Sequence, residues 1–287
     1  MDRKCQPKKG GSKKGGVAVG RRTCQSLSPR SDSPPATTER KSEVRLSVLG
    51  GFELVVDGEV VNIPGGSERV LAFVALCCRA AVPRALVAGA LWPEAPERCA
   101  CTNLRSALSR LRSLGRVALD VGPDEVRLAQ EVHVDLRYAR DFAHRVLDLS
   151  APSLAKELGP GTAAVEKLSA DVLPGWYDDW ALLAAEDWRQ LRMHALDALA
   201  DDFLSAERFA EAVAAAQAAV RSDPLRESSQ ACLIRAHLAE GNLCEARHDF
   251  TRYEQRLREE AGLRPTPRLC QLVAGLLPSS DRDRCFR

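Results

Sequence analysis

The chain has 287 residues, of which 45% are hydrophobic, so it is long enough for two domains of ordinary size and a sizeable buried core. It contains no run of about 18 apolar residues, and no apolar segment follows its basic N-terminus, which argues against a membrane-spanning helix and a secretory signal. We therefore expect a cytosolic protein whose ten cysteines are reduced thiols rather than a disulfide framework.

The net charge of +2 conceals an uneven distribution. Residues 1–43 hold 11 Lys and Arg against 4 Asp and Glu, whereas the remainder holds 30 basic and 35 acidic residues. The Lys, Gly, Ser and Pro of the first segment cannot bury enough apolar area to offset chain entropy, so we expect a disordered basic tail. Two interpretations stay open for it: an arm that adds non-specific attraction to DNA, and an inert extension.

Residues 44–132 show the plan of a winged helix-turn-helix domain with an added first hairpin. Two runs of β-branched and aliphatic residues flank VDGE, a D-G hairpin signal, and Pro64 should end the second strand. Two helices are expected next, over SERVLAFVALCC with Ser67 as N-cap and over PRALVAGALW with Pro83 in the first turn. A third helix is expected from about Arg98 to Gly115, followed by two short strands around a Gly-Pro-Asp turn.

Residues 135–277 lack strand signals and indicate an all-α, tetratricopeptide-like domain, followed by a tail at 278–287. The helical pattern runs from Trp176 to about Leu277, with breaks at Pro224, Gly241 and Gly262. ERFAEAV and GNLCEAR begin 34 residues apart, which is the tetratricopeptide period. The small and apolar residues expected at helix contacts are Ala212, Ala216 and Ala219 in the first copy, and Ala246 and Phe250 in the second. The predicted fold class is thus mainly α with a small β part.

The third helix has a face suited to a DNA groove. In NLRSALSRLR, Leu104, Leu108 and Leu111 share one side of the helix, small hydroxyl residues lie opposite, and arginines flank them. No carboxylate occurs between Arg98 and Arg116, so cationic side chains can reach phosphates or guanine edges unopposed. The alternative is a solvated amphipathic helix that happens to be rich in arginine. Its position as the third helix, directly before a hairpin, favours DNA binding.

We therefore predict double-stranded DNA as a partner. The residues expected to face it are Arg98, Thr102, Asn103, Arg105, Ser106, Ser109, Arg110 and Arg112 in the helix, with Arg116 and Arg127 at the hairpin. Arg116 and Arg127 are the only basic residues expected within reach of this wing, at about residues 117–130. Three acidic residues surround its tip, so it should not be a strong phosphate clamp: Asp120, Asp124 and Glu125.

No pattern indicates an enzyme, a cofactor or a metal ion. Cys99 and Cys101 form a C-x-C without a second pair at zinc-site spacing, and no phosphate-binding loop or nucleophile elbow occurs. The YDD at 177–179 could suggest a carboxylate pair, but it lies among tryptophans. We expect a structural role there, as core or domain-interface aromatics, for Trp176, Tyr177, Trp180 and Trp188.

Several of these segments resemble the Streptomyces antibiotic regulatory proteins. VRLSVLGGFEL, GSERVLAFVAL, LWP and NLRSALSRLR are similar to the DNA-binding domain of that family. LPGWYDDWALL, RQLRMHALDALA and DPLRESSQACLIRAHLAEGN resemble its bacterial transcriptional activator domain, and the resemblance covers roughly residues 44–277.

The resemblance implies an OmpR-type winged helix and a tetratricopeptide-like domain. It also implies a nucleoid-associated transcriptional activator of a secondary-metabolite, or antibiotic, gene cluster. Such a protein would bind direct repeats near promoters and contact RNA polymerase. Because one chain offers one recognition helix and a direct-repeat site needs two, we expect self-association on DNA. Because no NTPase follows the helical domain, we expect a short, single-function member. The alternative function is a tetratricopeptide-type interaction adaptor that does not read DNA, for which an acid-free arginine helix would be unnecessary.

Overall fold

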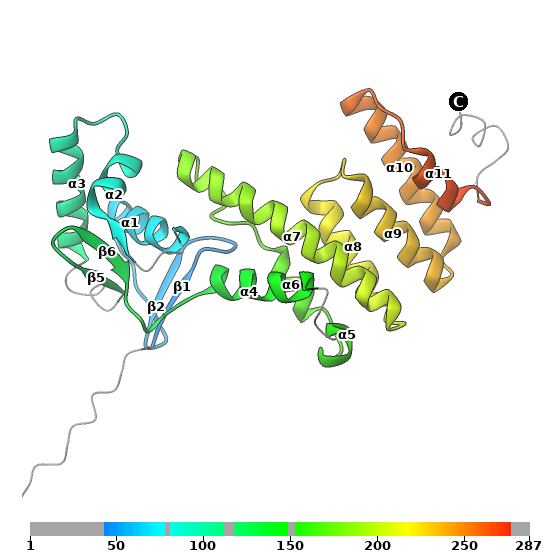
Figure 1. Ribbon diagram of the computed structural model, residues 1–287, viewed down its shortest axis with the longest axis horizontal. Coiled ribbons are helices and arrows are strands. Elements are labelled where there is room, and N and C mark those ends of the chain that lie inside the picture. Colours follow the sequence, from blue (N-terminus) through cyan, green and yellow to red (C-terminus); the bar gives the residue numbers. More distant parts are fainter. Residues whose placement is uncertain (1–42, 78–80, 112–117, 149–152, 277–287) are drawn as a thin grey trace, which may run out of the picture. The chain divides into compact units, whose positions relative to one another are not determined.

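The computed structural model describes residues 43–77, 81–111, 118–148 and 153–276, which belong to one compact unit (Figure 1). The predicted basic tail, up to residue 42, lies outside the described residues, as do Arg112, Arg116 and residues 277–287. The described chain is mostly helical with a small β part, which confirms the predicted fold class.

A four-stranded sheet opens the fold, in the order β3-β2-β1-β7. Its strands are β1 (Val44–Ser47), β2 (Glu53–Val56), β3 (Glu59–Val60) and β7 (Val132–Val134). The D-G hairpin is confirmed between β2 and β3, where Asp57 and Gly58 have φ angles of 51° and 86°, as a type I′ turn requires. The first apolar run, however, forms two strands rather than one, because Gly50 and Gly51 turn the chain. The parallel pairing of β7 with β1 was not expected.

Three helices and a second sheet complete the winged helix. The helices are α1 (Gly65–Leu76), α2 (Arg84–Leu91) and α3 (Glu97–Arg110), and the sheet has the order β4-β6-β5, from β4 (Val82–Pro83), β5 (Leu119–Val121) and β6 (Glu125–Leu128). Two expectations were wrong. Pro64, not Ser67, is the N-cap of α1, and α3 ends at Arg110 rather than near Gly115. The apolar spacing continues past Arg110 without Gly or Pro, so the sequence carries no local stop signal there.

The remaining chain is helical. Its elements are α4 (Asp135–Leu147), α5 (Leu154–Glu157), α6 (Ala163–Ser169), α7 (Asp179–Ser205), α8 (Phe209–Ser222), α9 (Glu227–Glu240), α10 (Leu243–Ala261) and α11 (Pro267–Val273). Gly241 and Gly262 close α9 and α10 in the left-handed conformation, as the predicted breaks require. A further break after α7 has no Gly or Pro, and Glu207 takes the positive φ there.

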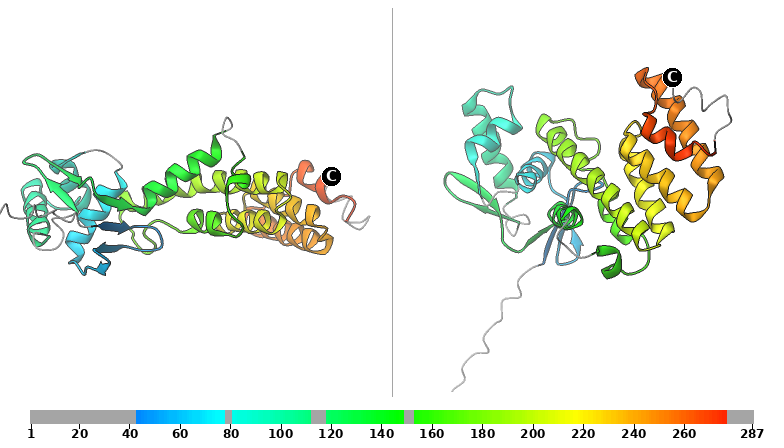
Figure 2. Two further views of the ribbon diagram at one scale, coloured as in Figure 1. Left: turned by 90° about the horizontal axis from the view of Figure 1, so that it is seen from below. Right: turned by 45° about the vertical axis from the view of Figure 1, so that its right-hand side comes forward.

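Helices α7 to α10 lie side by side as successive antiparallel neighbours (Figure 2). The small residues of the 34-residue repeat are buried between them: Ala212, Ala216, Ala219 and Ala246, together with Phe250. Small side chains let paired helices approach closely, so this burial confirms a tetratricopeptide-like packing. Within the described part of the chain, no helix is both long and apolar enough to cross a membrane.

Aromatic side chains join the winged helix to α7. Phe73 of α1 packs edge-to-face on Trp180, with ring centroids 5.4 Å apart, and Trp180 packs likewise on Trp176 at 5.8 Å. Trp188 is buried and donates its indole N–H to the carbonyl of Ala170. These three tryptophans take the predicted core and interface roles. Tyr177 does not: it is 83% exposed, because the chain turns its neighbour Trp176 inward and leaves Tyr177 facing solvent.

Candidate nucleic-acid interface

Helix α3 has one buried and one exposed face, as its sequence pattern predicts. Ala100, Leu104, Ala107 and Leu108 are buried in the core that α3 shares with α1 and α2, and Leu111 is buried directly after the helix. These positions recur every three to four residues, so a single stripe of the helix is covered. The opposite stripe is left for solvent or a ligand.

The exposed face of α3 brings together the described candidate residues. All of these are exposed: Arg98, Thr102, Asn103, Arg105, Ser106, Ser109 and Arg110. Figure 1 shows α3 at the periphery of the winged helix, next to α2 and α1. The sequence pattern thus identified the exposed residues correctly.

The arginines of this face are electrostatically unopposed. In the part of the chain that the structure describes, no carboxylate lies within ion-pair distance of Arg98, Arg105 or Arg110. Their guanidinium groups are therefore free to bind phosphate or a guanine edge in a bidentate manner. Thr102 differs, because its hydroxyl donates to the carbonyl of Arg98 at 2.8 Å. In this rotamer Thr102 can only accept a further hydrogen bond.

A buried hydroxyl attaches α3 to α1. Ser67 is fully buried, and its Oγ donates to the carbonyl oxygen of Ala107 at 2.8 Å. A buried hydrogen bond of this kind fixes both the depth and the rotation of α3 against α1. Sequence reasoning missed this role because Ser67, near the start of a helix, has the pattern of an N-cap.

The β5–β6 hairpin forms the wing, and its basic character is weak. Arg127 forms an ion pair with Asp120, with Nε and Oδ2 3.3 Å apart. The one described candidate arginine of the wing is therefore already paired. Asp124 and Glu125 at the turn are exposed, as expected. These charges do not favour a strong phosphate clamp.

Arg84, the first residue of α2, is a basic residue beside the wing that sequence reasoning missed. Its backbone N–H donates to Asp124 O at 2.8 Å, and its guanidinium lies 3.3 Å from Gly122 O and 3.4 Å from Pro123 O. The expectation that Arg116 and Arg127 are the only basic residues within reach was therefore wrong. The short strand β4 causes the difference, because it pairs with β6 and places the start of α2 beside the wing turn.

Another feature of the site is the placement of side chains that could bind a metal ion. In the described ranges, no group of three or more His, Cys, Asp or Glu residues could hold a metal ion. Cys99 is exposed and Cys101 is half-buried on α3.

Comparisons with known proteins agree with this architecture. Residues 144–277 match the bacterial transcriptional activator domain. The chain is 30% identical over 254 residues to the regulatory protein AfsR of Streptomyces coelicolor, covering 85% of this chain and 25% of AfsR. Identity to AfsR of Streptomyces griseus is 28% over 273 residues, covering 88% of this chain and 26% of that protein. The chain thus spans about a quarter of the length of these curated relatives.

Among solved structures, the fold is similar to that of Mycobacterium tuberculosis EmbR, solved in complex with a low-affinity phosphopeptide. The TM-score is 0.63 at 22% sequence identity, and the match covers 85% of this chain and 69% of the EmbR chain. At this identity the similarity shows a shared fold.

A winged helix with an exposed arginine-rich helix, followed by a bacterial transcriptional activator domain, defines a transcription regulator. Both AfsR relatives are named as regulatory proteins. The match to the bacterial transcriptional activator domain and the similarity to two AfsR proteins support the predicted resemblance to the Streptomyces antibiotic regulatory proteins.

Proposed function

We propose that this protein is a sequence-specific transcriptional activator that inserts α3 into the DNA major groove. The supporting observation is the exposed face of α3, where three arginines lack any carboxylate partner in the described chain and small hydroxyl side chains lie between them. Such a face allows close approach to base edges while the flanking guanidinium groups reach phosphates. The wing, with its paired Arg127, makes a lesser contact.

The proposed target is a promoter with direct repeats that controls a secondary-metabolite gene cluster, and the protein would act in the cytoplasm. Each chain has one recognition helix, so a direct-repeat site needs two chains, docked head to tail rather than around a two-fold axis. We assign self-association on DNA, contact with RNA polymerase, or both to the helical domain. Its residues 135–277 hold 17 basic and 23 acidic residues, a balance that disfavours DNA binding by this domain as a whole.

The test begins with an unbiased selection of bound DNA sequences, followed by titrations of Arg105→Ala and Arg110→Ala on the selected site. An arginine that reads a base should lose about 1–3 kcal/mol on the cognate site only. An arginine that binds a phosphate should weaken all sequences about equally and lower the salt slope by roughly 1. Arg247→Ala is the matched control, because Arg247 is an exposed arginine on α10.

Two outcomes would contradict the proposal. If both α3 variants bind the selected site as tightly as the wild type, α3 is not the reader. If the wild type is not retained by DNA or heparin at any salt concentration, the interaction adaptor becomes the better explanation.

A further inference from the structure

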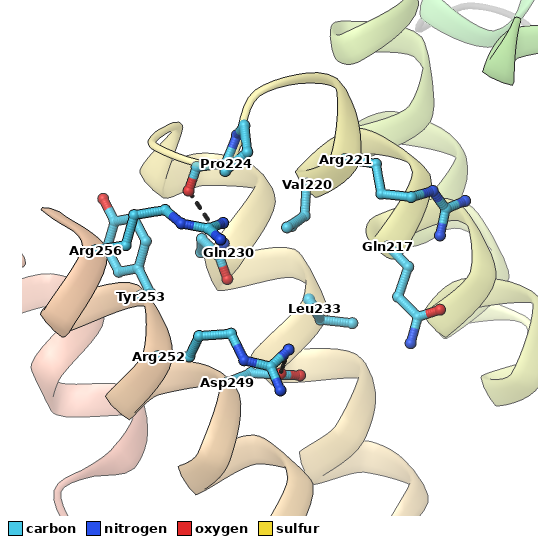
Figure 3. A pocket seen from close by; sticks show the side chains of 10 residues that line it. All are labelled: Gln217, Val220, Arg221, Pro224, Gln230, Leu233, Asp249, Arg252, Tyr253 and Arg256. Carbon is cyan, nitrogen blue, oxygen red and sulfur yellow. Dashed lines mark hydrogen bonds and ion pairs between the residues drawn. The ribbon is translucent and has the colours of Figure 1, made fainter. Parts of the chain in front are cut away.

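A groove lies between α8, α9 and α10 of the tetratricopeptide-like repeat (Figure 3). It encloses about 390 Å³. Arg221 comes from α8, Leu233 from α9, and Arg252 and Arg256 from α10, so both copies of the 34-residue repeat contribute to its walls. The groove lies in sequence far from α3 and has no role in the proposed reading of DNA.

The lining of the groove is basic within an acidic domain. Three arginines and one carboxylate, Asp249, line it, although residues 135–277 as a whole hold more acidic than basic residues. Asp249 is already engaged, because its carboxylate lies 3.3 Å from His237 Nε2 and 3.9 Å from Arg252 Nη1. Positive charge therefore exceeds negative charge at the groove walls.

The arginines differ in how free they are. Arg256 pairs with Glu260 at 3.4 Å, and Arg252 also contacts His248 at 3.0 Å. Arg221 is exposed and has no hydrogen-bond or ion-pair partner among the described residues, and the same holds for the amide of Gln217 one turn earlier. Arg221 and Gln217 thus present unused donors on the α8 wall, across the groove from Arg252 (Figure 3).

Between the charged walls lie apolar groups. Val220 and Leu233 line the groove beside Pro224, so a ligand can bury an apolar side chain there while its anionic groups meet arginines on either side. A simple inorganic anion would leave these apolar groups uncovered. An extended peptide with carboxylates flanking an apolar residue fits both features.

We propose that this groove binds an acidic, carboxylate-bearing segment of a partner protein. Residues 1–43 are basic and residues 277–287 hold three Arg against two Asp, so neither segment has the acidic character that the groove favours. The proposal gives a surface and a chemistry to the partner-binding role of the helical domain proposed above. It does not require that α3 reads DNA.

The test is fluorescence anisotropy with the intact chain and a labelled twelve-residue peptide of Glu-Leu-Asp repeats, with a Gln-Leu-Asn peptide as the neutral control. The wild type should bind the acidic peptide and not the neutral one, more weakly as salt rises. Arg221→Glu combined with Arg252→Glu should raise the Kd at least about tenfold. Arg247→Glu makes the same change of charge on α10 outside the groove and should bind like the wild type.

Further arms separate the alternatives. Arg221→Ala alone should raise the Kd about threefold. Because Arg221 has no partner among the described residues, thermal unfolding of this variant should match the wild type. Excess inorganic phosphate should compete poorly, whereas full displacement by phosphate would show a general anion site and overturn the proposal. Peptide binding that survives the double substitution would also overturn it.

Binding of the selected promoter DNA is measured in parallel with the same variants. The double groove variant should keep wild-type DNA affinity, and a large loss would show that the groove contacts nucleic acid instead. Failure of the Arg105 and Arg110 tests with intact peptide binding would reject the proposed DNA reading alone. Loss of DNA binding in the Arg105 and Arg110 variants, together with peptide binding that fails its test, would reject only the groove proposal.

Discussion

Two arginines of the candidate interface, Arg105 and Arg127, differ in what surrounds them. Arg105 on α3 is exposed and has no carboxylate within ion-pair distance in the described chain, whereas Arg127 on the wing is paired with Asp120 at 3.3 Å. To bind phosphate, the guanidinium of Arg127 must either break its ion pair with Asp120 or keep that pair while it contacts the phosphate. An exposed ion pair of this kind contributes little to stability, but the carboxylate lowers the positive electrostatic potential that the wing presents to DNA.

We expect Arg127→Ala to weaken DNA binding less than Arg105→Ala does. Titrations of both variants on the selected site at one salt concentration would measure the difference. Asp120→Ala offers a further check, because it frees Arg127 and should tighten binding slightly. A larger loss from Arg127→Ala than from Arg105→Ala would move the main contact from α3 to the wing.

Exposed and buried cysteines should differ in reactivity, as Cys99 and Cys232 illustrate. Burial raises the pKa of the Cys232 thiol, and with the nearby carboxylates of Asp201 and Asp197, which also raise it, and Arg235, which lowers it, the pKa is about 11. The thiolate is the nucleophile, and at pH 8 only about one in a thousand Cys232 side chains is in the thiolate form. Cys99 on α3 is exposed.

Limited alkylation with iodoacetamide, mapped by mass spectrometry, should therefore label Cys99 well before Cys232. The labelling rate of Cys232 should rise about tenfold per pH unit as its thiolate fraction grows. Rapid labelling of Cys232 at neutral pH would contradict its burial between α7 and α9. Prior unfolding in denaturant should abolish the difference.

At the scale of elements, α3 is held by apolar packing and one buried hydrogen bond. Ser67 in α1 is fully buried, and its hydroxyl bonds the carbonyl of Ala107 at 2.8 Å. We expect Ser67→Ala to lower the free energy of unfolding by about 1–2 kcal/mol, because the carbonyl of Ala107 loses a partner in a buried setting. Urea unfolding followed by circular dichroism measures this change.

Ser106→Ala, on α3, is the control for Ser67→Ala. Ser106 is exposed on α3, so its replacement should change the free energy of unfolding by less than about 0.5 kcal/mol. If Ser106 contacts DNA, this variant should bind less tightly while remaining as stable as the wild type. Equal stability losses in the two variants would show that the Ser67 hydroxyl does not anchor α3.

At the scale of the whole molecule, the winged helix and the helical domain share structure. Strand β7 pairs with β1 from Val44 opposite Val132 to Leu46 opposite Val134, so a fragment that ends at residue 132 would lose most of this strand. Asp135 at the start of α4 accepts hydrogen bonds from the backbone N–H groups of Val48 and Leu49. Arg69 of α1 donates to the carboxylate of Asp178 before α7 and to Leu91 O at 2.9 Å. A DNA-binding fragment should therefore retain β7 and α4.

We expect residues 43–148 to bind promoter DNA without activating transcription. The fragment keeps α3, the wing and the first sheet, but it lacks the groove and the helices proposed to engage partners. Transcription in vitro with saturating fragment and with saturating intact chain compares the two, after circular dichroism shows that the fragment is folded. Full activation by the fragment would reject this division of roles.

The sequence by itself determined the features that depend on neighbours along the chain. Leu104 and Leu108 recur at helical spacing, and this spacing assigned the exposed face of α3 correctly. The D-G hairpin and the helix ends at Gly241 and Gly262 follow from local backbone preferences. The 34-residue offset predicted the helix pairs because Ala212 recurs as Ala246 and each copy has a further contact residue four positions later, Ala216 and Phe250.

Only the tertiary structure decided the features that join distant segments. Ser67 meets Ala107 across 40 residues, and Arg84 meets the wing turn through β4, because helix and strand packing brings these positions together. Tyr177 differs from the neighbouring Trp176 in exposure, which depends on the surface that each one meets after α7 docks. The basic groove likewise arises only when α8 and α10 place their arginines on facing walls. Periodicity along a chain states which side of an element is buried, and packing alone states what that side touches.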